Sequence, residues 1–266
     1  MIIFDCGYST DVDGLGTRLV FYLKGCNFRC DWCGAPESIS PRPEELHYPG
    51  RTVLAGIAAT PQWVVSKSVR CRAFTDGVTF GGGEPTLQAE ELIPVLRELK
   101  KSGVHTALES NASTNRYREV IPWTDQLFSD LKTLSPEKFA ARISSETSLL
   151  ENVKANLRHA ALTHASLTIR IPVIRGLNDT ETDEREIGIF LKRLLDAGGR
   201  FQVQLLRQHH IAEPKYAALN RTYVCRGVPA PDVRVTERFA EILNGFQIGL
   251  ISDQTTGGAS GENIGN

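Results

Sequence analysis

The sequence lacks any apolar run close to the roughly 20 residues that a membrane-spanning helix requires. Its first residues, Met1 to Asp5, do not resemble a secretory signal peptide. Lysine and arginine (30) nearly balance aspartate and glutamate (31), which leaves a formal charge of -1. That balance argues against a general role on nucleic acids or on membrane surfaces. We therefore expect a cytoplasmic protein whose partners include neither nucleic acid nor membrane.

The cysteine content offers little for a disulfide framework. Three of the six cysteines are scattered and have no neighbour at metal-binding spacing, which favours structural roles: Cys6, Cys71 and Cys225. The others, Cys26, Cys30 and Cys33, are clustered directly after an apolar run. Clustered thiols in a chain of this composition indicate metal ligands. Three ligands leave one coordination position free, which favours an iron–sulfur cluster with an open iron. A structural zinc site would need a fourth ligand, which His47 or Asp31 could supply.

Apolar, β-branched runs alternate with segments of helical periodicity. The runs predict strands at residues 18–24, 77–81, 103–109, 126–131, 166–173, 201–206 and 246–251. Helical spacing recurs at 88–99, 151–157 and 186–195. This alternation predicts a parallel α/β sheet that is closed or partly closed into a barrel. We expect one domain over residues 1–252, an irregular loop at 34–52 and a mobile tail at 253–266.

Chemically useful residues follow the predicted strands one after another. The carboxyl ends of parallel strands meet at one edge of the sheet, where the active sites of such folds lie. Besides the three cysteines, that edge is predicted to collect Gly81-Gly82-Gly83-Glu84-Pro85, Glu109-Ser110-Asn111, Asp130-Leu131-Lys132, Arg170 and His209. Taken singly, each group has an ordinary interpretation as a tight turn, a surface ion pair or a packed polar side chain. Their arrival at one rim favours a shared site.

The spacing Cys-x3-Cys-x2-Cys, with Trp32 before the last cysteine, resembles the signature of the radical S-adenosylmethionine (SAM) superfamily. Further segments, in order, are similar to the glycyl-radical-enzyme activating enzymes, of which the pyruvate formate-lyase activating enzyme is the type member. These segments are Asp13-Gly14-Leu15-Gly16-Thr17-Arg18, Trp32-Cys33-Gly34-Ala35-Pro36-Glu37-Ser38, Gly77 to Pro85, Asp130-Leu131-Lys132, Ile169 to Asp179, Leu205 to His209 and Glu213-Pro214-Lys215-Tyr216.

The resemblance implies a partial (β/α)6 TIM-like barrel that holds a [4Fe–4S] cluster on Cys26, Cys30 and Cys33. SAM would bind the free iron through its amino and carboxylate groups. Carried over by position, the residues around SAM would be Trp32, Gly82, Gly83, Glu84, Ser110, Lys132, Arg170 and His209. Among these, the glycine run and Glu84 would contact the amino group, and Lys132 the carboxylate. Glu109 and Asp130, with Ser110, would lie at a monovalent-cation site.

The resemblance also implies an activity. One electron from the reduced cluster would cleave SAM to methionine and a 5′-deoxyadenosyl radical, which in activating enzymes abstracts a hydrogen from a glycine Cα of a partner glycyl radical enzyme. The electron donor would be of the flavodoxin or ferredoxin type, and we expect a monomer.

Several positions depart from the activating-enzyme pattern. Many activating enzymes carry a cysteine-rich ferredoxin-like insert, but residues 39–76 contain only Cys71, so we expect no second cluster. Leu15 replaces a usual proline and Gly81 a usual serine. These departures concern the substrate side and leave two alternatives open. One is a radical SAM biosynthetic enzyme that acts on a small molecule or peptide, and the other is a zinc-stabilised, non-catalytic binding protein.

Overall fold

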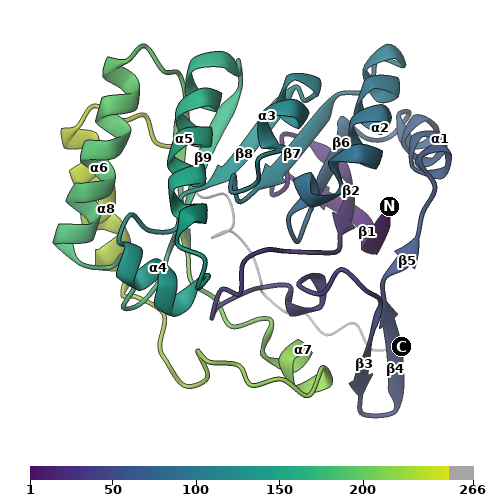
Figure 1. Cartoon of the computed structure of the whole chain (residues 1–266), viewed down its shortest axis with the longest axis horizontal. Coiled ribbons are helices and arrows are strands. Elements are labelled where there is room, and N and C mark those ends of the chain that lie inside the picture. The colour runs from purple at the N-terminus through teal and green to yellow at the C-terminus, as the bar shows by residue number, and fades with distance from the viewer. Residues whose placement is uncertain (252–266) are drawn as a thin grey trace.

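The computed structural model describes residues 1–251 and shows an α/β fold built on one main sheet (Figure 1). Eight strands form this sheet in the order β10-β9-β8-β7-β6-β2-β1-β5. Six neighbouring strands run parallel to one another: β2 (Thr17–Leu23), β6 (Gly77–Gly82), β7 (Thr106–Ser110), β8 (Gln126–Asp130), β9 (Leu167–Val173) and β10 (Gln202–Arg207). The predicted α/β class with a mostly parallel sheet is therefore confirmed.

Two antiparallel strands extend the sheet beyond β2. Strand β1 (Ile2–Thr10) pairs with β2, and the short β5 (Ile57–Ala58) pairs with the start of β1. The sequence did not predict either strand. In β1 the polar or small residues Asp5, Gly7 and Ser9 interrupt the apolar pattern, and most of the strand is only half-buried. A partly exposed strand near the edge of a sheet can tolerate such residues because one face meets solvent.

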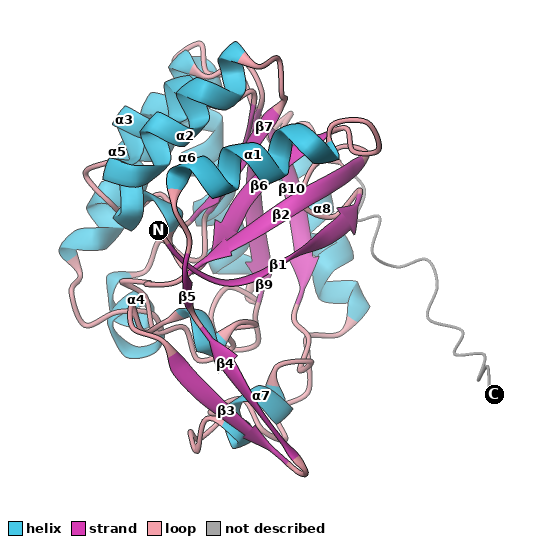
Figure 2. Cartoon of the chain, turned by 90° about the vertical axis from the view of Figure 1, so that its right-hand side faces the viewer, coloured by secondary structure: helices cyan, strands magenta, loops and turns pink. Residues whose placement is uncertain are grey.

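Helices cover the outer face of the sheet (Figures 1 and 2). They are α1 (Pro61–Cys71), α2 (Ala89–Lys101), α3 (Tyr117–Val120), α4 (Pro136–Arg142), α5 (Ser148–Thr163), α6 (Glu181–Asp196) and α8 (Val233–Gly245). Helix α7 (Glu213–Ala218) lies below the sheet instead. The helical periods at 88–99, 151–157 and 186–195 correspond to α2, α5 and α6. Among residues 1–251, no helix is long and apolar enough to cross a membrane.

Helix α2 shows how local sequence fixes these elements. Glu90 and Glu91 lie in its first turn and Lys100 and Lys101 in its last, so both ends carry charges that oppose the helix dipole. The helix stops at Lys101, and Gly103 follows with a φ of +66°. Glycine adopts this left-handed conformation without the steric penalty of a Cβ atom. The helix therefore ends at the pair Ser102-Gly103.

The prediction of an irregular loop over residues 34–52 was wrong. The segment contains a 3₁₀ turn at Pro36–Ser38 and most of a β-hairpin formed by β3 (Glu44–Tyr48) and β4 (Arg51–Ala55). The hairpin reverses direction at Gly50, where φ is +75°. It projects below the sheet, and helix α7 lies against it (Figure 2). The hairpin buries Leu46 and Ala55 against Ala218 of α7, a contact that no local sequence pattern could reveal.

The strand predicted at 246–251 was also wrong. Only Leu250 forms a bridge, to Val203 of β10, and Gln247 has a φ of +61° that interrupts an extended run. The tail predicted at 253–266 lies outside the described residues. A single domain ending at residue 252 stays a prediction.

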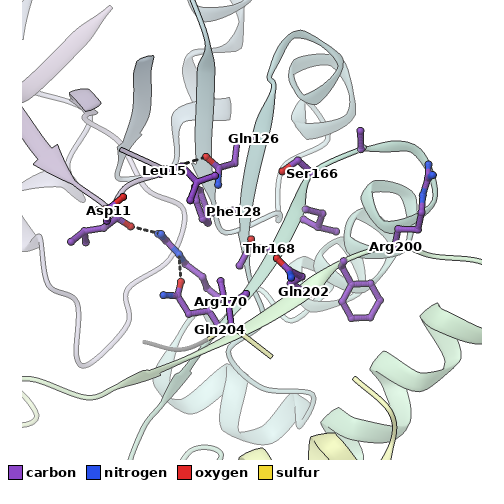
Figure 3. Close-up of a pocket in the computed structure, with 16 residues that line it drawn as sticks. Asp11, Leu15, Gln126, Phe128, Ser166, Thr168, Arg170, Arg200, Gln202 and Gln204 are labelled. Carbon is purple, nitrogen blue, oxygen red and sulfur yellow. Dashed lines mark hydrogen bonds between the residues drawn. The ribbon is translucent and has the colours of Figure 1, made fainter. Parts of the chain in front are cut away.

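The inner face of the last three parallel strands is polar rather than apolar (Figure 3). Thr168 on β9 lies beside Phe128 and Gln202, and Arg170 lies beside Gln204. Closed (β/α)8 barrels fill this space with layers of branched apolar side chains. In this protein, the polar side chains instead surround a cavity.

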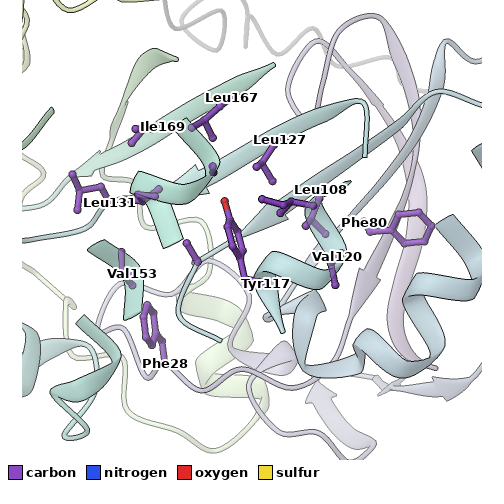
Figure 4. Close-up of a cluster of buried hydrophobic side chains, with 14 of the residues drawn as sticks. Phe28, Phe80, Leu108, Tyr117, Val120, Leu127, Leu131, Val153, Leu167 and Ile169 are labelled. Carbon is purple, nitrogen blue, oxygen red and sulfur yellow. The ribbon is translucent and has the colours of Figure 1, made fainter. Parts of the chain in front are cut away.

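The apolar core lies on the other face of the sheet, between the strands and the helices (Figure 4). Leu108, Leu127 and Ile169 from neighbouring strands are completely buried there, together with Tyr117 and Val120 of α3. The hydroxyl group of Tyr117 lies 2.6 Å from Ser129 Oγ, so its polar end is satisfied inside the core. This packing holds the strands in register and thereby fixes the positions of the residues at their carboxyl ends.

Candidate active site at the carboxyl ends of the strands

The three clustered cysteines lie in a loop that leaves strand β2. Hydrogen bonds hold the loop from two sides. On one side, Cys26 N donates to Ile39 O at 3.0 Å, and on the other, Arg29 N donates to Ile143 O at 2.7 Å and Asp31 N donates to Arg142 O at 3.2 Å. Strand β2 and the segments around residues 39 and 142 therefore all contribute to the shape of the cysteine loop.

A cavity of about 230 Å³ lies against this loop, and all three cysteines line it. It also receives side chains or backbone from the ends of β6, β7, β8, β9 and β10. Of the other residues singled out in the sequence, the following line the cavity: Trp32, Gly82, Gly83, Glu109, Ser110, Asp130, Lys132 and Arg170. Glu84 and His209 do not line it. The carboxyl ends of the parallel strands thus bring most of the candidate residues to one place.

Burial dominates the chemistry of the three thiols. It raises the pKa of Cys26 to about 12 and also raises the pKa values of Cys30 and Cys33. The positive charge of Lys132 opposes this rise at all three. Buried thiols lose their protons when a metal binds, because the metal stabilises the thiolate directly. The donor set is therefore suited to a metal group rather than to free thiolates.

The spacing of the donors separates two kinds of metal group. Within residues 1–251, no three His, Cys, Asp or Glu side chains converge closely enough to hold a single metal ion. A structural zinc site needs four such ligands around one ion. In an iron–sulfur cluster each thiolate binds a different iron, so its ligands stand farther apart. Three cysteines that line one cavity without converging on a single point match the donor set of a cluster.

The glycine run at the end of β6 passes close to the cysteine loop. Gly82 has a φ of +110°, which favours glycine, and Gly83 N donates to Leu23 O at 2.8 Å. Glu84 N donates to Gly25 O at 2.7 Å. The run therefore pairs with the backbone that leads into Cys26 and forms one wall of the cavity.

The Glu84 side chain is directed away from the cavity and is completely buried. One carboxylate oxygen accepts from Thr86 N at 3.1 Å and Ser110 Oγ at 2.8 Å, and the other accepts from Asn111 N at 2.7 Å. Burial raises the pKa of Glu84, and these hydrogen bonds oppose the rise. In this structure Glu84 joins the end of β6 to the end of β7, so a ligand would meet the backbone of the glycine run rather than this carboxylate.

Asp130 and Lys132 form an ion pair at the end of β8. Lys132 Nζ donates to Asp130 Oδ2 at 2.5 Å, and their side chains are 14% and 30% exposed, respectively. Burial by itself lowers the pKa of Lys132, but Asp130 and the neighbouring Cys30 raise it above its usual value. Lys132 therefore stays an ammonium ion beside the cysteines.

Glu109 on β7 and Arg170 on β9 form a second ion pair across the intervening strand β8. Arg170 Nη1 donates to Glu109 Oε1 at 2.5 Å. The guanidinium also donates to Val12 O at 2.6 Å and to Gln204 Oε1 at 3.0 Å, and it lies 3.9 Å from the centre of the Phe128 ring. Burial raises the pKa of Glu109 to about 7; Arg170 opposes the rise and Asp13 adds to it.

His209 lies at the rim of the site and is exposed. A β-carbon on Gly34 would stand 3.5 Å from its Cε1 atom, which places the ring beside the end of the cysteine loop. Partial burial and the neighbouring His210 lower the pKa of His209, so its ring is neutral at pH 7.

Asn111, which the sequence places at the end of a strand without assigning it a role, contacts the cysteine loop. Asn111 Nδ2 lies 3.7 Å from Cys26 Sγ and 3.1 Å from Asn27 Oδ1. It therefore holds the first cysteine from the end of β7. Its position immediately after Glu109-Ser110 at a predicted strand end was a usable signal. Phe28 and Leu206 also line the cavity and supply apolar surface.

A second cavity, of about 560 Å³, lies at the opposite ends of strands β8 to β10 (Figure 3). The loop after β1 forms one wall through Asp11 and Leu15, and the polar inner face of the strands forms another. Arg170 lines both cavities. The Glu109–Arg170 pair therefore stands between the cysteine-lined cavity and the second one.

Comparison with known proteins gives a consistent result. The family model described as the radical SAM superfamily matches residues 20–185. The (2S)-3-sulfopropanediol dehydratase activating enzyme of Klebsiella oxytoca is 28% identical, over 85% of this chain and 88% of that protein. The pyruvate formate-lyase 1-activating enzyme of Escherichia coli K12 is 29% identical, over 88% of this chain and 92% of that protein.

Solved structures show the same relationship. A domain of the pyruvate formate-lyase activating enzyme from Bacteroides vulgatus has a TM-score of 0.52 at 25% identity and covers 66% of this chain and 98% of that one. A radical SAM methyltransferase from Sphaerobacter thermophilus has a TM-score of 0.57 at 18% identity and covers 89% of this chain and 66% of that one. At that identity the second likeness supports the fold alone.

Proposed function

Because the chain belongs to the radical SAM superfamily, we propose that it activates a partner glycyl radical enzyme by removing a hydrogen atom from a glycine Cα. The observation that carries the proposal is the cavity at the end of β2, where Cys26, Cys30 and Cys33 face Lys132 and the glycine run. Relatives that match most of the chain are named activating enzymes, which favours this target over a small molecule or a free peptide.

The cofactors of the family are a [4Fe–4S] cluster and SAM, and the residues present fit both. The three thiols would hold the cluster, and the ammonium group of Lys132 would attract the carboxylate of SAM. Carbonyl groups of the glycine run would accept hydrogen bonds from the amino group of SAM, because Gly82 and Gly83 bring bare backbone to the cavity wall. When bound, these cofactors supply a one-electron cleavage that gives methionine and a 5′-deoxyadenosyl radical.

The remaining side chains would shape the ligand site. Trp32 and Phe28 provide apolar walls, and Ser110 lies at the end of β7. Arg170 lines the cavity, but it already donates hydrogen bonds to Glu109, Val12 and Gln204. His209 at the rim would cover the edge of a ligand without lining the present cavity. The second cavity, on the far side of Arg170, gives a glycine-bearing segment of the partner a polar space in which to lie.

The proposal includes further partners. An electron donor of the flavodoxin or ferredoxin type would reduce the cluster, and the protein would act as a monomer in the cytoplasm. The hydrogen taken from the partner would end on the 5′ carbon of 5′-deoxyadenosine, and the partner would keep the unpaired electron on its glycine. Atoms and electrons balance, since the donor supplies one electron and SAM leaves as methionine and 5′-deoxyadenosine.

The decisive experiment uses a partner enzyme labelled with deuterium at glycine Cα. The protein is loaded with iron and sulfide under anaerobic conditions, reduced, and mixed with SAM and a glycyl radical enzyme from the same genome. We expect one deuterium in 5′-deoxyadenosine. The glycyl EPR signal should be a doublet with the unlabelled partner and a singlet with the labelled one, because the hydrogen that stays on Cα causes the splitting. The Cys30→Ala variant is the control and should give neither signal. SAM cleavage without label transfer from any such partner would argue against the activating role.

A further inference from the structure

The three residues that the sequence suggested as ligands of a monovalent cation are already engaged within the protein. Glu109 is held by the Arg170 guanidinium, and its other carboxylate oxygen lies 2.7 Å from the point where a β-carbon on Gly81 would stand. The Ser110 hydroxyl donates to Glu84 at 2.8 Å and accepts from Ala112 N at 3.0 Å. A cation at this position would therefore compete with existing partners for its ligands.

Asp130 is engaged in the same way. Its carboxylate accepts from Lys132 Nζ at 2.5 Å, and Lys132 is mostly buried. In the sheet, Asp130 lies directly beside Arg170 of the neighbouring strand. Two carboxylates therefore face two fixed cations, all on the inner side of β7, β8 and β9. Asp13 brings a third carboxylate near Glu109 and raises the pKa of Glu109, but each of the two carboxylates suggested as cation ligands already has a cation of its own.

We propose that Arg170 and Lys132 supply the positive charge that a monovalent cation would otherwise provide, so that ligand binding at this site does not depend on potassium or sodium. The inference rests on the proposed function, because it concerns the same SAM site. Arg170 acts in it as a positioning residue, through Glu109. The candidate residues for a cation thus do not fit a cation in this chain.

The contacts of Arg170 explain why an ion from solution would not displace it. The guanidinium has three hydrogen-bonding partners on separate elements, namely Glu109 on β7, Val12 in the loop after β1 and Gln204 on β10. Its central carbon also lies over the Phe128 ring, 3.9 Å from the ring centre. Planar, multidentate binding of this kind is specific to arginine. A monovalent ion could replace only the contact of the guanidinium with Glu109. Val12 O and Gln204 Oε1 would then lose the donor that they have now.

The first test measures SAM binding to the cluster-loaded protein by equilibrium dialysis. Potassium, sodium and tetramethylammonium chloride are compared at one ionic strength, because tetramethylammonium is too large for a carboxylate-lined cation site. We expect dissociation constants that agree within about twofold, a difference well under the tenfold step of 1.4 kcal/mol. Binding that is tenfold tighter in potassium would overturn the inference. Failure to bind SAM in any salt would instead contradict the proposed function.

The second test removes the proposed substitute. In Arg170→Gln the Glu109 carboxylate loses its cation, and we expect SAM affinity to become dependent on potassium while tetramethylammonium has no effect. A direct readout is sodium-23 NMR, in which the variant should broaden the sodium signal and the wild-type protein should not. A variant whose SAM affinity is the same in all salts would overturn the substitution.

Two controls keep this test informative. Arg200→Gln changes an exposed arginine at the edge of the second cavity, and it should stay independent of potassium. Arg170→Lys retains a positive charge, so it distinguishes the loss of that charge from a failure of the protein to fold. It should bind SAM without potassium dependence, and dependence in this variant would contradict the role given to the fixed charge.

Discussion

Gly83 lies so close to Gly25 that a β-carbon on Gly83 would overlap the Gly25 carbonyl oxygen and stand 2.8 Å from its carbonyl carbon. The same atom would stand 3.1 Å from Ser38 O. These neighbours are all backbone atoms, which cannot rotate away as a side chain can. The glycine run therefore sets the distance between strand β6 and the loop that carries the cysteines.

Replacing Gly83 with alanine should push the cysteine loop away from β6. We expect a loss of roughly 1–3 kcal/mol in the free energy of unfolding, the usual cost of overpacking a tight contact. Because the loop begins with Gly25 and continues into Cys26, the iron content per chain should fall as well. Denaturant unfolding and iron analysis measure the two effects separately.

Gly7→Ala is the matched control. Gly7 lies in β1, and a β-carbon there would meet no atom within 4 Å. Alanine limits the unfolded chain more than glycine does, so this variant should be as stable as the wild-type protein or slightly more stable. Equal losses in both variants would show that the contact with Gly25 is not what Gly83 provides.

Cys30→Ala should abolish cluster binding. Two remaining thiols cannot fix a cluster whose protein ligands are three cysteines, so iron, sulfide and the visible absorption of the cluster should all be lost. Cys6→Ala, which changes a cysteine of β1 away from the cavity, should retain them. A Cys30→Ala protein that still cleaves SAM would contradict the ligand assignment.

Lys132→Ala should weaken SAM binding without removing the cluster. The change deletes the ammonium group that faces the cavity and leaves Asp130 without its partner, so we expect affinity to fall by roughly ten- to a hundredfold, the range of a charge-assisted hydrogen bond. Lys138→Ala, which breaks an ion pair with Asp183 on α6, is the control and should bind SAM normally. Unchanged SAM affinity in Lys132→Ala would remove this residue from the site.

The sequence predicted those parts of the fold in which local pattern and final burial agree. The six parallel strands carry enough apolar residues to be recognised, because one face of each packs against the helices, and α2 carries a clear helical period with a glycine stop. The β3–β4 hairpin was missed because Glu44 and Glu45 dilute its apolar content and its buried residue, Leu46, packs on α7, far along the chain. Long-range contacts of this kind leave no local signal.

The same limit applies to the site. Strand ends could be located from the sequence, and this brought Lys132, Gly82 and the cysteines to one edge. The direction of each side chain could not be read in that way. Glu84 follows the glycine run but points into the protein, since its acceptors are needed by the backbone of Asn111 and by Thr86. The Glu109–Arg170 pair joins residues 61 positions apart, and only the pairing of β7, β8 and β9 in the sheet brings them into contact.

Glu109 should make stability depend on pH. Its carboxyl group has a pKa of about 7 in the folded protein, above the usual glutamate value of 4.5, because burial disfavours the charged form. The folded state therefore binds the proton more tightly than the unfolded state. The associated stabilisation is complete below about pH 4.5 and is lost as pH rises to about 7, by roughly 3 kcal/mol.

Comparison with Glu109→Gln isolates this effect, because other titrating groups contribute to both proteins. The wild-type protein should lose stability relative to the variant between pH 5 and pH 7, and the difference should be constant from pH 7.5 to pH 9. Denaturant unfolding at half-unit pH steps measures it. A difference that grows in favour of the wild-type protein as pH rises would mean that Arg170 outweighs burial at this carboxylate.

Glu84→Gln tests whether this carboxylate is a structural connection between β6 and β7. The substitution preserves shape but replaces one acceptor oxygen with an NH₂ group. Either that group faces the N–H of Asn111, or the amide turns and faces Thr86 and Ser110. In each case a buried donor loses its acceptor, which costs about 2–3 kcal/mol in the free energy of unfolding. Since Asn111 contacts Cys26, iron content should fall in parallel with stability.

Glu90→Gln, on the exposed side of α2, is the control and should change stability by less than about 0.5 kcal/mol. If Glu84→Gln were as stable as Glu90→Gln but bound SAM weakly, Glu84 would have to contact the ligand and not the backbone of β7.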